Sequence, residues 1–321
     1  MSHTPVPASS EAGRETSRNT PEGSLTVGDV VALVEAAAPP GLAASWDSNG
    51  LICGDPADPV RSILLAVDPV AAVVDEAINA GVDMVITHHP LYLRGTDHVA
   101  ATDPKGRCIH RLIRAGIALL NAHTSLDAAR GGVADALAER VGLVSTVPLE
   151  PDPDSPDQGI GRIGTLPQPV TLRRLAEDVA AALPDSAPGL LVGGDLDAIV
   201  ERIAVSGGAG DSLLQRAREA GVDVFLTADL RHHPASEHLE AGRPYLLCGT
   251  HWATEWVGLE PLARRLTEDA HTRGASLCVQ VSLARRLEEG ARSHGGSLAV
   301  QVSRIVTDPW ALRLPTGPDR A

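Results

Sequence analysis

Aromatic residues make up only 2% of this chain of 321 residues. Ala, Val, Leu and Ile must therefore supply most of its core. The four cysteines are far apart and form no CxxC pair, so the sequence predicts neither a disulfide framework nor a thiolate zinc site. No apolar run approaches the length of a membrane span, and no membrane association is expected.

Clusters of Lys and Arg are also missing from the chain, whose formal net charge is −14. Nucleic-acid binding is therefore not expected, because it depends on basic side chains that replace the counterions of the phosphate backbone. Residues 1–24 are rich in Ser, Thr, Pro, Glu and Gly and lack the apolar segment of a signal peptide. This composition predicts a disordered tail and a cytoplasmic protein.

Apolar patterns of strand and helix length alternate along the chain, which is typical of α/β proteins. One series consists of a strand at 63–67, a helix at 70–80 and a strand at 82–87. A similar series recurs at 203–205, 212–220 and 222–227. Both series carry Ala-Gly-Val-Asp before or within the last strand and His-His-Pro shortly after it. We therefore expect two related α/β halves that face one another, with the chemistry at their junction.

The first of these motifs, His88-His89-Pro90, directly follows the apolar segment 82–87. Neighbouring side chains at a strand end point to opposite sides of the backbone, so the two imidazoles could reach two metal ions or share one. Taken alone, the pair could equally form hydrogen bonds with backbone carbonyl groups.

Three further sets of potential metal ligands follow other apolar segments. They are His123 with Asp127, His251 with Glu255, and Asp229 with His232 and His233. A spacing of four residues would place His251 and Glu255 on one face of a helix. Because open α/β sheets place their active sites at the carboxyl ends of the strands, the four sets together predict a metal cluster.

Several of these residues also have a structural interpretation. Asp127 could cap a helix that begins after it, and His251 and Glu255 could form a solvated helical pair. The glycine-rich segment 207–210 could offer backbone N–H groups to a phosphate, but a plain tight turn would use the same residues.

A tandem repeat lies near the end of the chain. Residues 262–282 (LARRLTEDAHTRGASLCVQVS) are followed directly by residues 283–303 (LARRLEEGARSHGGSLAVQVS), and about two thirds of the positions match without a gap. Each copy has the pattern of a helix followed by a strand. Only one copy can occupy a given position in a sheet, and we expect the first helix and the second strand, 298–302, to do so.

Five motifs occur in the order found in one known family. They are Trp46-Asp47-Ser48-Asn49-Gly50-Leu51, Thr87-His88-His89-Pro90, Ala122-His123-Thr124-Ser125-Leu126-Asp127, Thr227-Ala228-Asp229 with His233, and Gly249-Thr250-His251 with Glu255. From about Leu25 to Trp310 the chain resembles the dinuclear-metal, hexameric family of type 2 GTP cyclohydrolase I homologues, also called NGG1-interacting-factor-like. Ser48 replaces a more usual Asn and Ala228 a more usual Gly, but no proposed ligand is replaced.

The resemblance implies an α/β fold of two interlinked, similar domains with a metal cleft between them, and a toroidal homohexamer built as a trimer of dimers. It implies two divalent metal ions per subunit, with Asp127 as a bridging ligand. The implied ligands are His88, His89, Asp127, His251 and Glu255. His123 and His233 are candidates for a catalytic role. Ligation by nitrogen and oxygen allows zinc, iron, manganese, nickel or cobalt.

On this basis, residues 25–147 plus 245–312 are expected to form the metal-binding α/β domain and residues 148–244 the second α/β domain. Residues 1–24 and 313–321 are expected to be tails. The segment 148–157, dense in Pro and Asp, is the predicted crossing between the halves.

Two divalent ions suit a metal-dependent hydrolase that acts on a small phosphorylated or nucleotide substrate. It could open a purine ring, as a GTP cyclohydrolase does, or cleave a phosphoester. The alternative is a non-enzymatic scaffold, in which the metals are structural and the hexameric ring serves assembly or protein interaction. Open coordination positions would favour the enzyme, and saturated ligation the scaffold.

Overall fold

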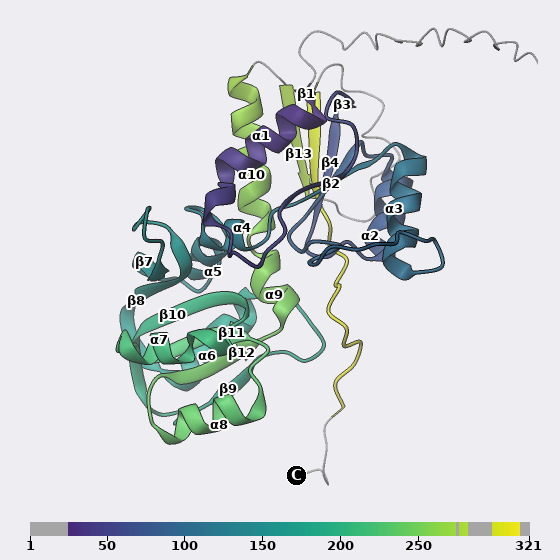
Figure 1. Cartoon of the computed structure of the whole chain (residues 1–321). Coiled ribbons are helices and arrows are strands. Elements are labelled where there is room, and N and C mark those ends of the chain that lie inside the picture. The colour runs from purple at the N-terminus through teal and green to yellow at the C-terminus, as the bar shows by residue number, and fades with distance from the viewer. Residues whose placement is uncertain (1–24, 274–275, 282–296, 315–321) are drawn as a thin grey trace, which may run out of the picture.

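The protein folds into two lobes, each built on a six-stranded sheet (Figure 1). The computed structural model describes residues 25–273, 276–281 and 297–314. The predicted tail at 1–24 and most of the one at 313–321 lie outside these residues. Among the described helices, none is both long enough and apolar enough to cross a membrane.

The first lobe contains the sheet β13-β14-β4-β5-β6-β2. Its strands are β2 (Gly50–Cys53), β4 (Ser62–Ala66), β5 (Met84–Thr87), β6 (Ala118–Asn121), β13 (Ser276–Val281) and β14 (Ser297–Val302). All neighbours are parallel except β2, which runs antiparallel to β6 at one edge. A two-stranded ribbon of β1 (Leu25–Thr26) and β3 (Pro59–Val60) adjoins it, and the short 3-10 helix η1 (Pro40–Leu42) follows the first helix.

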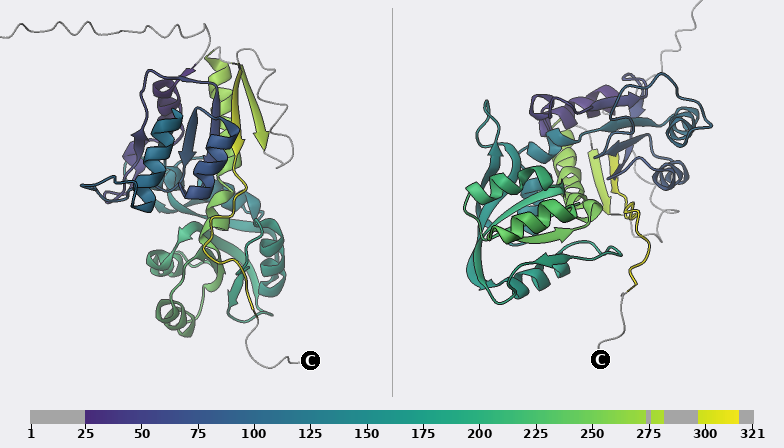
Figure 2. Two further views of the ribbon diagram at one scale, coloured as in Figure 1. Left: turned by 90° about the vertical axis from the view of Figure 1, so that its right-hand side faces the viewer. Right: turned by 60° about the horizontal axis from the view of Figure 1, so that its bottom comes forward.

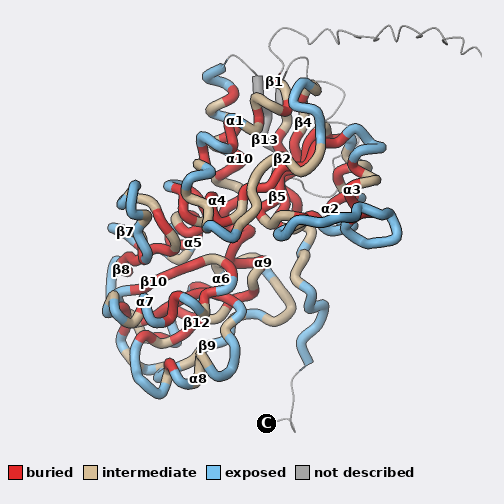
Figure 3. Tube along the Cα trace, in the orientation of Figure 1, coloured by how far each residue is buried: buried red, intermediate tan, exposed pale blue. Residues whose placement is uncertain are grey.

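Helices cover both faces of this sheet because alternate strand residues point to opposite sides. Ile63, Leu65 and Ile86 pack with α1 (Val27–Ala37) and α10 (Leu259–Thr272). Leu64 and Val85 pack with α2 (Ala71–Ala80) and α3 (Pro104–Ala115) on the other face. Strands buried on both sides read as continuous apolar runs, which is why the sequence patterns predicted them. Figure 3 shows this burial along the strands.

The second lobe contains the sheet β7-β8-β10-β11-β12-β9. Its strands are β7 (Val144–Pro151), β8 (Gly159–Thr171), β9 (Leu191–Gly193), β10 (Ile199–Ala209), β11 (Val224–Ala228) and β12 (Tyr245–Gly249). The central strands β10, β11 and β12 are parallel, and the outer strands are antiparallel to their neighbours. The helices α5 (Val133–Arg140) and α6 (Leu172–Ala182) pack on one face. The other face carries η2 (Asp211–Leu213), α7 (Leu214–Glu219) and α8 (His232–Glu240).

The two lobes repeat one βαβ unit, as the sequence predicted. The unit is β4-α2-β5 in the first lobe and β10-α7-β11 in the second. Asp83 accepts hydrogen bonds from two successive backbone N–H groups at the start of β4, at 2.8 and 2.9 Å. Asp223 does the same for β10, with two bonds of 2.9 Å. The shared Ala-Gly-Val-Asp motif therefore fastens the same two strands together in each lobe.

The lobes divide at slightly different residues from those predicted. β7 begins at Val144 and β12 ends at Gly249, and both belong to the second sheet. The predicted domain of 148–244 leaves out part of β7 and all of β12, which is paired on both sides by β11 and β9. The chain returns to the first lobe after Gly249, through α9 (His251–Trp256).

Both strands of the tandem repeat lie in the first sheet. β14 pairs with β4, so the expectation that residues 298–302 would take this position is confirmed. β13 forms the edge beyond it, and each residue of β13 faces the matching residue of β14, from Ser276 opposite Ser297 to Val281 opposite Val302. The helix of the first copy is α10, whereas the predicted helix of the second copy falls outside the described residues.

The carboxyl ends of the central strands in the two sheets meet at the junction of the lobes. The C-terminal segment, in yellow, leaves β14 and runs toward the second lobe (Figure 2). This geometry brings loops from both sheets, α4 (Thr124–Ala128), α9 and the C-terminal segment to one place.

Candidate metal centre

The predicted ligands converge at this junction. His88 and His89 follow β5, His123 and Asp127 follow β6, and His251 and Glu255 lie on α9 after β12. Two overlapping groups place their potential ligand atoms within 4.8 Å of one another: His88, His89 and His123 in the first, and His89, His251 and Glu255 in the second. His89 belongs to both groups.

His89 and His251 face each other through their Nε2 atoms, an arrangement that is unfavourable for two isolated neutral imidazoles. The Nδ1 atom of His89 lies 2.6 Å from Asp68, and that of His251 lies 2.7 Å from Asp229. A carboxylate accepts a hydrogen bond, so in each neutral ring Nδ1 carries the proton and Nε2 presents a lone pair. The two Nε2 atoms are 3.2 Å apart. In neutral imidazoles these lone pairs would repel each other, and a shared cation removes the repulsion.

The remaining two histidines have the same orientation. His88 Nδ1 lies 3.2 Å from the carbonyl oxygen of Ala122, and His123 Nδ1 lies 2.7 Å from Asp47. Both partners accept hydrogen bonds, so these Nδ1 atoms are also protonated and Nε2 is the free ring nitrogen. Four imidazoles therefore share the tautomer that suits metal ligation through Nε2.

The carboxylates complete a set of buried atoms that lack hydrogen bonds. Glu255 is 3% exposed, and its oxygens lie 3.5, 3.0 and 2.9 Å from Nε2 of His88, His89 and His251. Asp127 Oδ1 lies 3.6 Å from His88 Nε2. His88 Nε2, Asp127 Oδ1 and Glu255 Oε2 have no hydrogen-bond partner among the described residues. Buried polar atoms without partners are costly, and nitrogen and oxygen donors of this kind fit a divalent cation.

The charges of the cluster shift several pKa values. The shifts favour positive charge at this point, which a bound cation would supply. Burial disfavours charged His89 and His251, but Glu255 outweighs it together with Asp68 at His89 and Asp229 at His251. The pKa values rise to about 10 and about 9. Burial raises the pKa of Asp127 to about 6. The charge of His88 opposes this increase, and the charge of Glu255 adds to it. In Glu255 the histidines overcome burial and hold the pKa well below its usual range. Positive charge is thus strongly favoured at this point.

Two supporting carboxylates were not predicted from the sequence. Asp68 follows β4 and holds His89, and it also accepts a hydrogen bond from Thr307 of the C-terminal segment. Asp47 holds His123 and accepts hydrogen bonds from the backbone and hydroxyl of Thr124. Asp68 could have been found, because it follows a strand of the same sheet. Asp47 lies in the first family motif, but nothing in its spacing indicated a partner.

The glycine-rich segment after Val205 serves close packing. Gly208 has a φ of +64°, and a Cβ atom there would lie 2.3 Å from Glu255 Oε1 and 3.1 Å from His251 Nε2. Its N–H donates to Thr254 Oγ1 at 3.0 Å, and the N–H of Gly210 donates to the carbonyl of Ala228. These two N–H groups are therefore not available to a phosphate, and the glycine at 208 lets the backbone reach the ligands.

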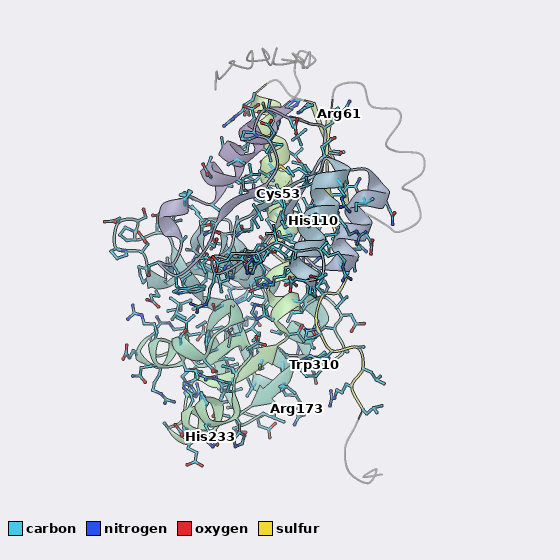
Figure 4. The ribbon with its side chains drawn as sticks, turned by 45° about the vertical axis from the view of Figure 1, so that its right-hand side comes forward. Cys53, Arg61, His110, Arg173, His233 and Trp310 are labelled. Carbon is cyan, nitrogen blue, oxygen red and sulfur yellow. The ribbon has the colours of Figure 1, made fainter. Side chains whose placement is uncertain are left out.

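His232 and His233 lie outside the cluster. Both are exposed at the start of α8, and Figure 4 shows His233 at the far end of the second lobe. The catalytic role considered for His233 therefore has no support in its position. The two His-His-Pro motifs differ because His88 comes directly after β5, whereas His232 comes four residues after β11 and begins a helix. Asp229 lies between β11 and His232 in the sequence, and it supports His251 instead.

A cavity of about 860 Å³ opens beside the cluster. His89, His123, Asp127, His251 and Glu255 line it, together with Trp46, Leu93, Ile160, Leu213, Leu230 and Trp310. Four of the five predicted metal ligands, all except the buried His88, therefore face a space that a small molecule can enter.

Comparison with known proteins identifies the family of this chain. The sequence model of the family Duf34/NIF3 (NGG1p interacting factor 3) matches residues 25–286. A Streptomyces coelicolor protein named GTP cyclohydrolase 1 type 2 homolog is 45% identical, over 90% of the chain and 95% of that protein. A Bacillus cereus protein related to NIF3 has a similar structure, with a TM-score of 0.78 and 23% identity over 90% of the chain and 99% of its own. A Staphylococcus aureus protein gives a TM-score of 0.76 and 25% identity, over 89% and 98%. The resemblance seen in the motifs is confirmed, and the chain belongs to the Duf34/NIF3 family.

Proposed function

We propose that this protein is a metal-dependent hydrolase that uses two divalent metal ions per subunit. The ligands are His88, His89, Asp127, His251 and Glu255. The observation that carries the proposal is the shared orientation of the imidazoles, which keeps a proton on Nδ1 and aims Nε2 at buried, unpaired carboxylate oxygens. The donor set allows zinc, iron, manganese, nickel or cobalt.

His123 is the residue of this chain that we assign to proton transfer. Burial and the charge of His88 lower its pKa, which favours the neutral ring. Asp47 keeps the proton on Nδ1 and orients the ring, leaving Nε2 free to accept a proton beside the cluster. When bound, two divalent ions would lower the pKa of a coordinated water and polarise a substrate oxygen or carbon.

The open cavity favours an enzyme over a purely structural metal site, because a structural site has no need of access for a small molecule. The name of the Streptomyces coelicolor relative points to the same class of reaction. We propose a nucleotide or small phosphorylated compound as the substrate, with ring opening or phosphoester cleavage as the reaction. The homohexameric ring, a trimer of dimers, and the cytoplasmic location stay predictions.

The proposal is tested with the purified full chain, loaded with Zn²⁺ or Mn²⁺ and incubated with nucleosides, nucleotides and phosphoesters. We expect hydrolysis that a chelator abolishes and that the His123→Ala variant loses while it keeps its metal. His233→Ala is the matched control, because it removes an exposed histidine away from the cluster. Metal-loaded protein that hydrolyses none of these compounds would favour the non-enzymatic scaffold.

A further inference from the structure

Two aromatic rings stand on the wall of the cavity with much of their surface uncovered. Trp46 and Trp310 line it and are 61% and 66% exposed. Trp46 makes an edge contact with His123, with ring centroids 5.9 Å apart. Trp310, labelled in Figure 4, belongs to the C-terminal segment, which Thr307 fastens to Asp68 beside His89. Exposed indoles next to a polar site offer a flat apolar surface on which a heterocycle can stack.

The charged residues on the wall are all acidic apart from the histidines. Of the described residues that line the cavity, none is Lys or Arg. The carboxylates on the wall are Asp68, Asp127, Glu150, Asp229, Glu255 and Asp308. Two divalent ions would supply four positive charges against these six negative ones, so the loaded cavity stays net negative. A polyphosphate chain usually needs basic side chains or helix N-termini in addition to metal ions.

Two backbone features that could replace basic side chains do not do so. In the segment 207–210, the N–H groups of Gly208 and Gly210 donate to Thr254 and Ala228. Residues 159–164 read GxGxxG, but they lie inside β8, where they pair with β7 and β10. A dinucleotide-binding loop joins a strand to a helix, so this match carries no anion site.

We propose that the substrate is a planar nitrogen heterocycle, such as a purine base or nucleoside, that carries at most one phosphate. The indole surfaces of Trp46 and Trp310 bind the ring, and the acidic wall disfavours each further phosphate. This inference rests on the proposed hydrolase function and narrows its substrate from nucleotides in general.

The test measures binding to metal-loaded protein and does not depend on turnover. Guanosine, GMP and GTP form one probe series and adenosine, AMP and ATP another, in which the base is constant and the charge increases. Quenching of tryptophan fluorescence and calorimetry report the affinities. We expect the triphosphates to bind at least about tenfold more weakly than the nucleosides, with most of the difference lost at high salt.

Three variants separate stacking from charge. Trp46→Leu and Trp310→Leu should each weaken nucleoside binding about tenfold, the usual effect of removing one stacked ring. Glu150→Lys should raise the affinity for the triphosphate relative to the nucleoside, because Glu150 is an exposed carboxylate on the wall. Val192→Leu, at an exposed position of the second lobe that does not line the cavity, is the control and should change neither affinity.

The outcomes distinguish this inference from the proposed function. Triphosphates that bind as tightly as the nucleosides, or nucleosides that fail to bind, would overturn the inference and leave the hydrolase proposal intact. If the nucleosides, monophosphates and triphosphates bind in the expected order but none is hydrolysed, the inference on the ring and its charge is supported. The hydrolase proposal then fails.

Discussion

Replacing Gly208 by Ala is a sharp test of how the fold presents its proposed ligands. The added Cβ atom would lie 2.3 Å from Glu255 Oε1, where ordinary contact begins at 3.4 Å. Glu255 must therefore move by about 1 Å or the backbone of β10 must shift. Metal coordination tolerates deviations of only about 0.2 Å. The Gly208→Ala variant should thus displace a ligand that contacts three histidines.

The substitution also strains the backbone, since Gly208 has a φ of +64°. In this left-handed conformation, a residue with a Cβ atom destabilises the folded state by about 1–2 kcal/mol. Gly221 separates the two effects, because it has nearly the same φ, +65°, and a Cβ atom there would meet nothing within 4 Å. Gly221→Ala should therefore show the backbone strain alone.

The assay is a metal titration against a competing chelator, together with thermal unfolding in the presence and absence of metal. Without metal, Gly221→Ala should lose about 1–2 kcal/mol of stability and Gly208→Ala at least as much. Only Gly208→Ala should lose metal affinity, by roughly 100-fold or more, since altered support of a ligand alone costs roughly 10–100-fold. Equal metal affinity in the two variants would refute the reasoning.

Three further predictions concern the ligands, their support and the repeat. Asp127→Ala should remove both metals and Glu255→Ala chiefly one, because we propose that Asp127 bridges and Glu255 belongs to one of the two groups; two full equivalents in the Asp127→Ala protein, by elemental analysis, would refute the bridge. Asp68→Asn should weaken metal binding roughly 10–100-fold in a chelator competition, because it weakens the acceptor that orients His89; unchanged affinity would show that Asp68 has no such role. Deleting residues 274–295, about one repeat length, should leave a folded, metal-binding hexamer by light scattering, because α10 then continues into β14, a neighbouring strand in the same register as β13. Insoluble protein or lost metal would show that the surplus copy is integral to the core.

The sequence predicted the cluster of potential metal ligands because His88, His123 and His251 each follow closely after a buried strand. Strand ends of one parallel sheet meet at one edge, so His88 and Asp127 could be grouped without knowing the pairing. His251 follows β12 of the other sheet, and it joins them because the two lobes meet at these strand ends. The same reasoning failed for His233, because it took the second His-His-Pro as equivalent to the first. Four residues separate it from β11, enough for the chain to leave the sheet edge and begin α8.

Hydrogen bonds that support the ligands from distant positions in the sequence could not be predicted in the same way. Asp47 and His123 are 76 positions apart, and Thr307 reaches Asp68 across 239 positions. Such contacts depend on how loops and the C-terminal segment pack, which no local pattern records. The division of the lobes was also missed by a few residues, because β12 reads as an apolar strand that either sheet could accept. Only its pairing with β11 and β9 in the folded protein shows that β12 belongs to the second sheet.

The central claim is that this cluster holds two divalent metal ions. The most direct test is elemental analysis of the purified full chain, saturated with Zn²⁺ or Mn²⁺ and freed of excess metal, alongside its His89→Ala and His233→Ala variants. His89 belongs to both ligand groups, whereas His233 is exposed in the second lobe. We predict two equivalents per chain in the unmodified protein and in His233→Ala, and loss of metal in His89→Ala. An unmodified protein without bound metal, or a His89→Ala variant that keeps both equivalents, would contradict the account.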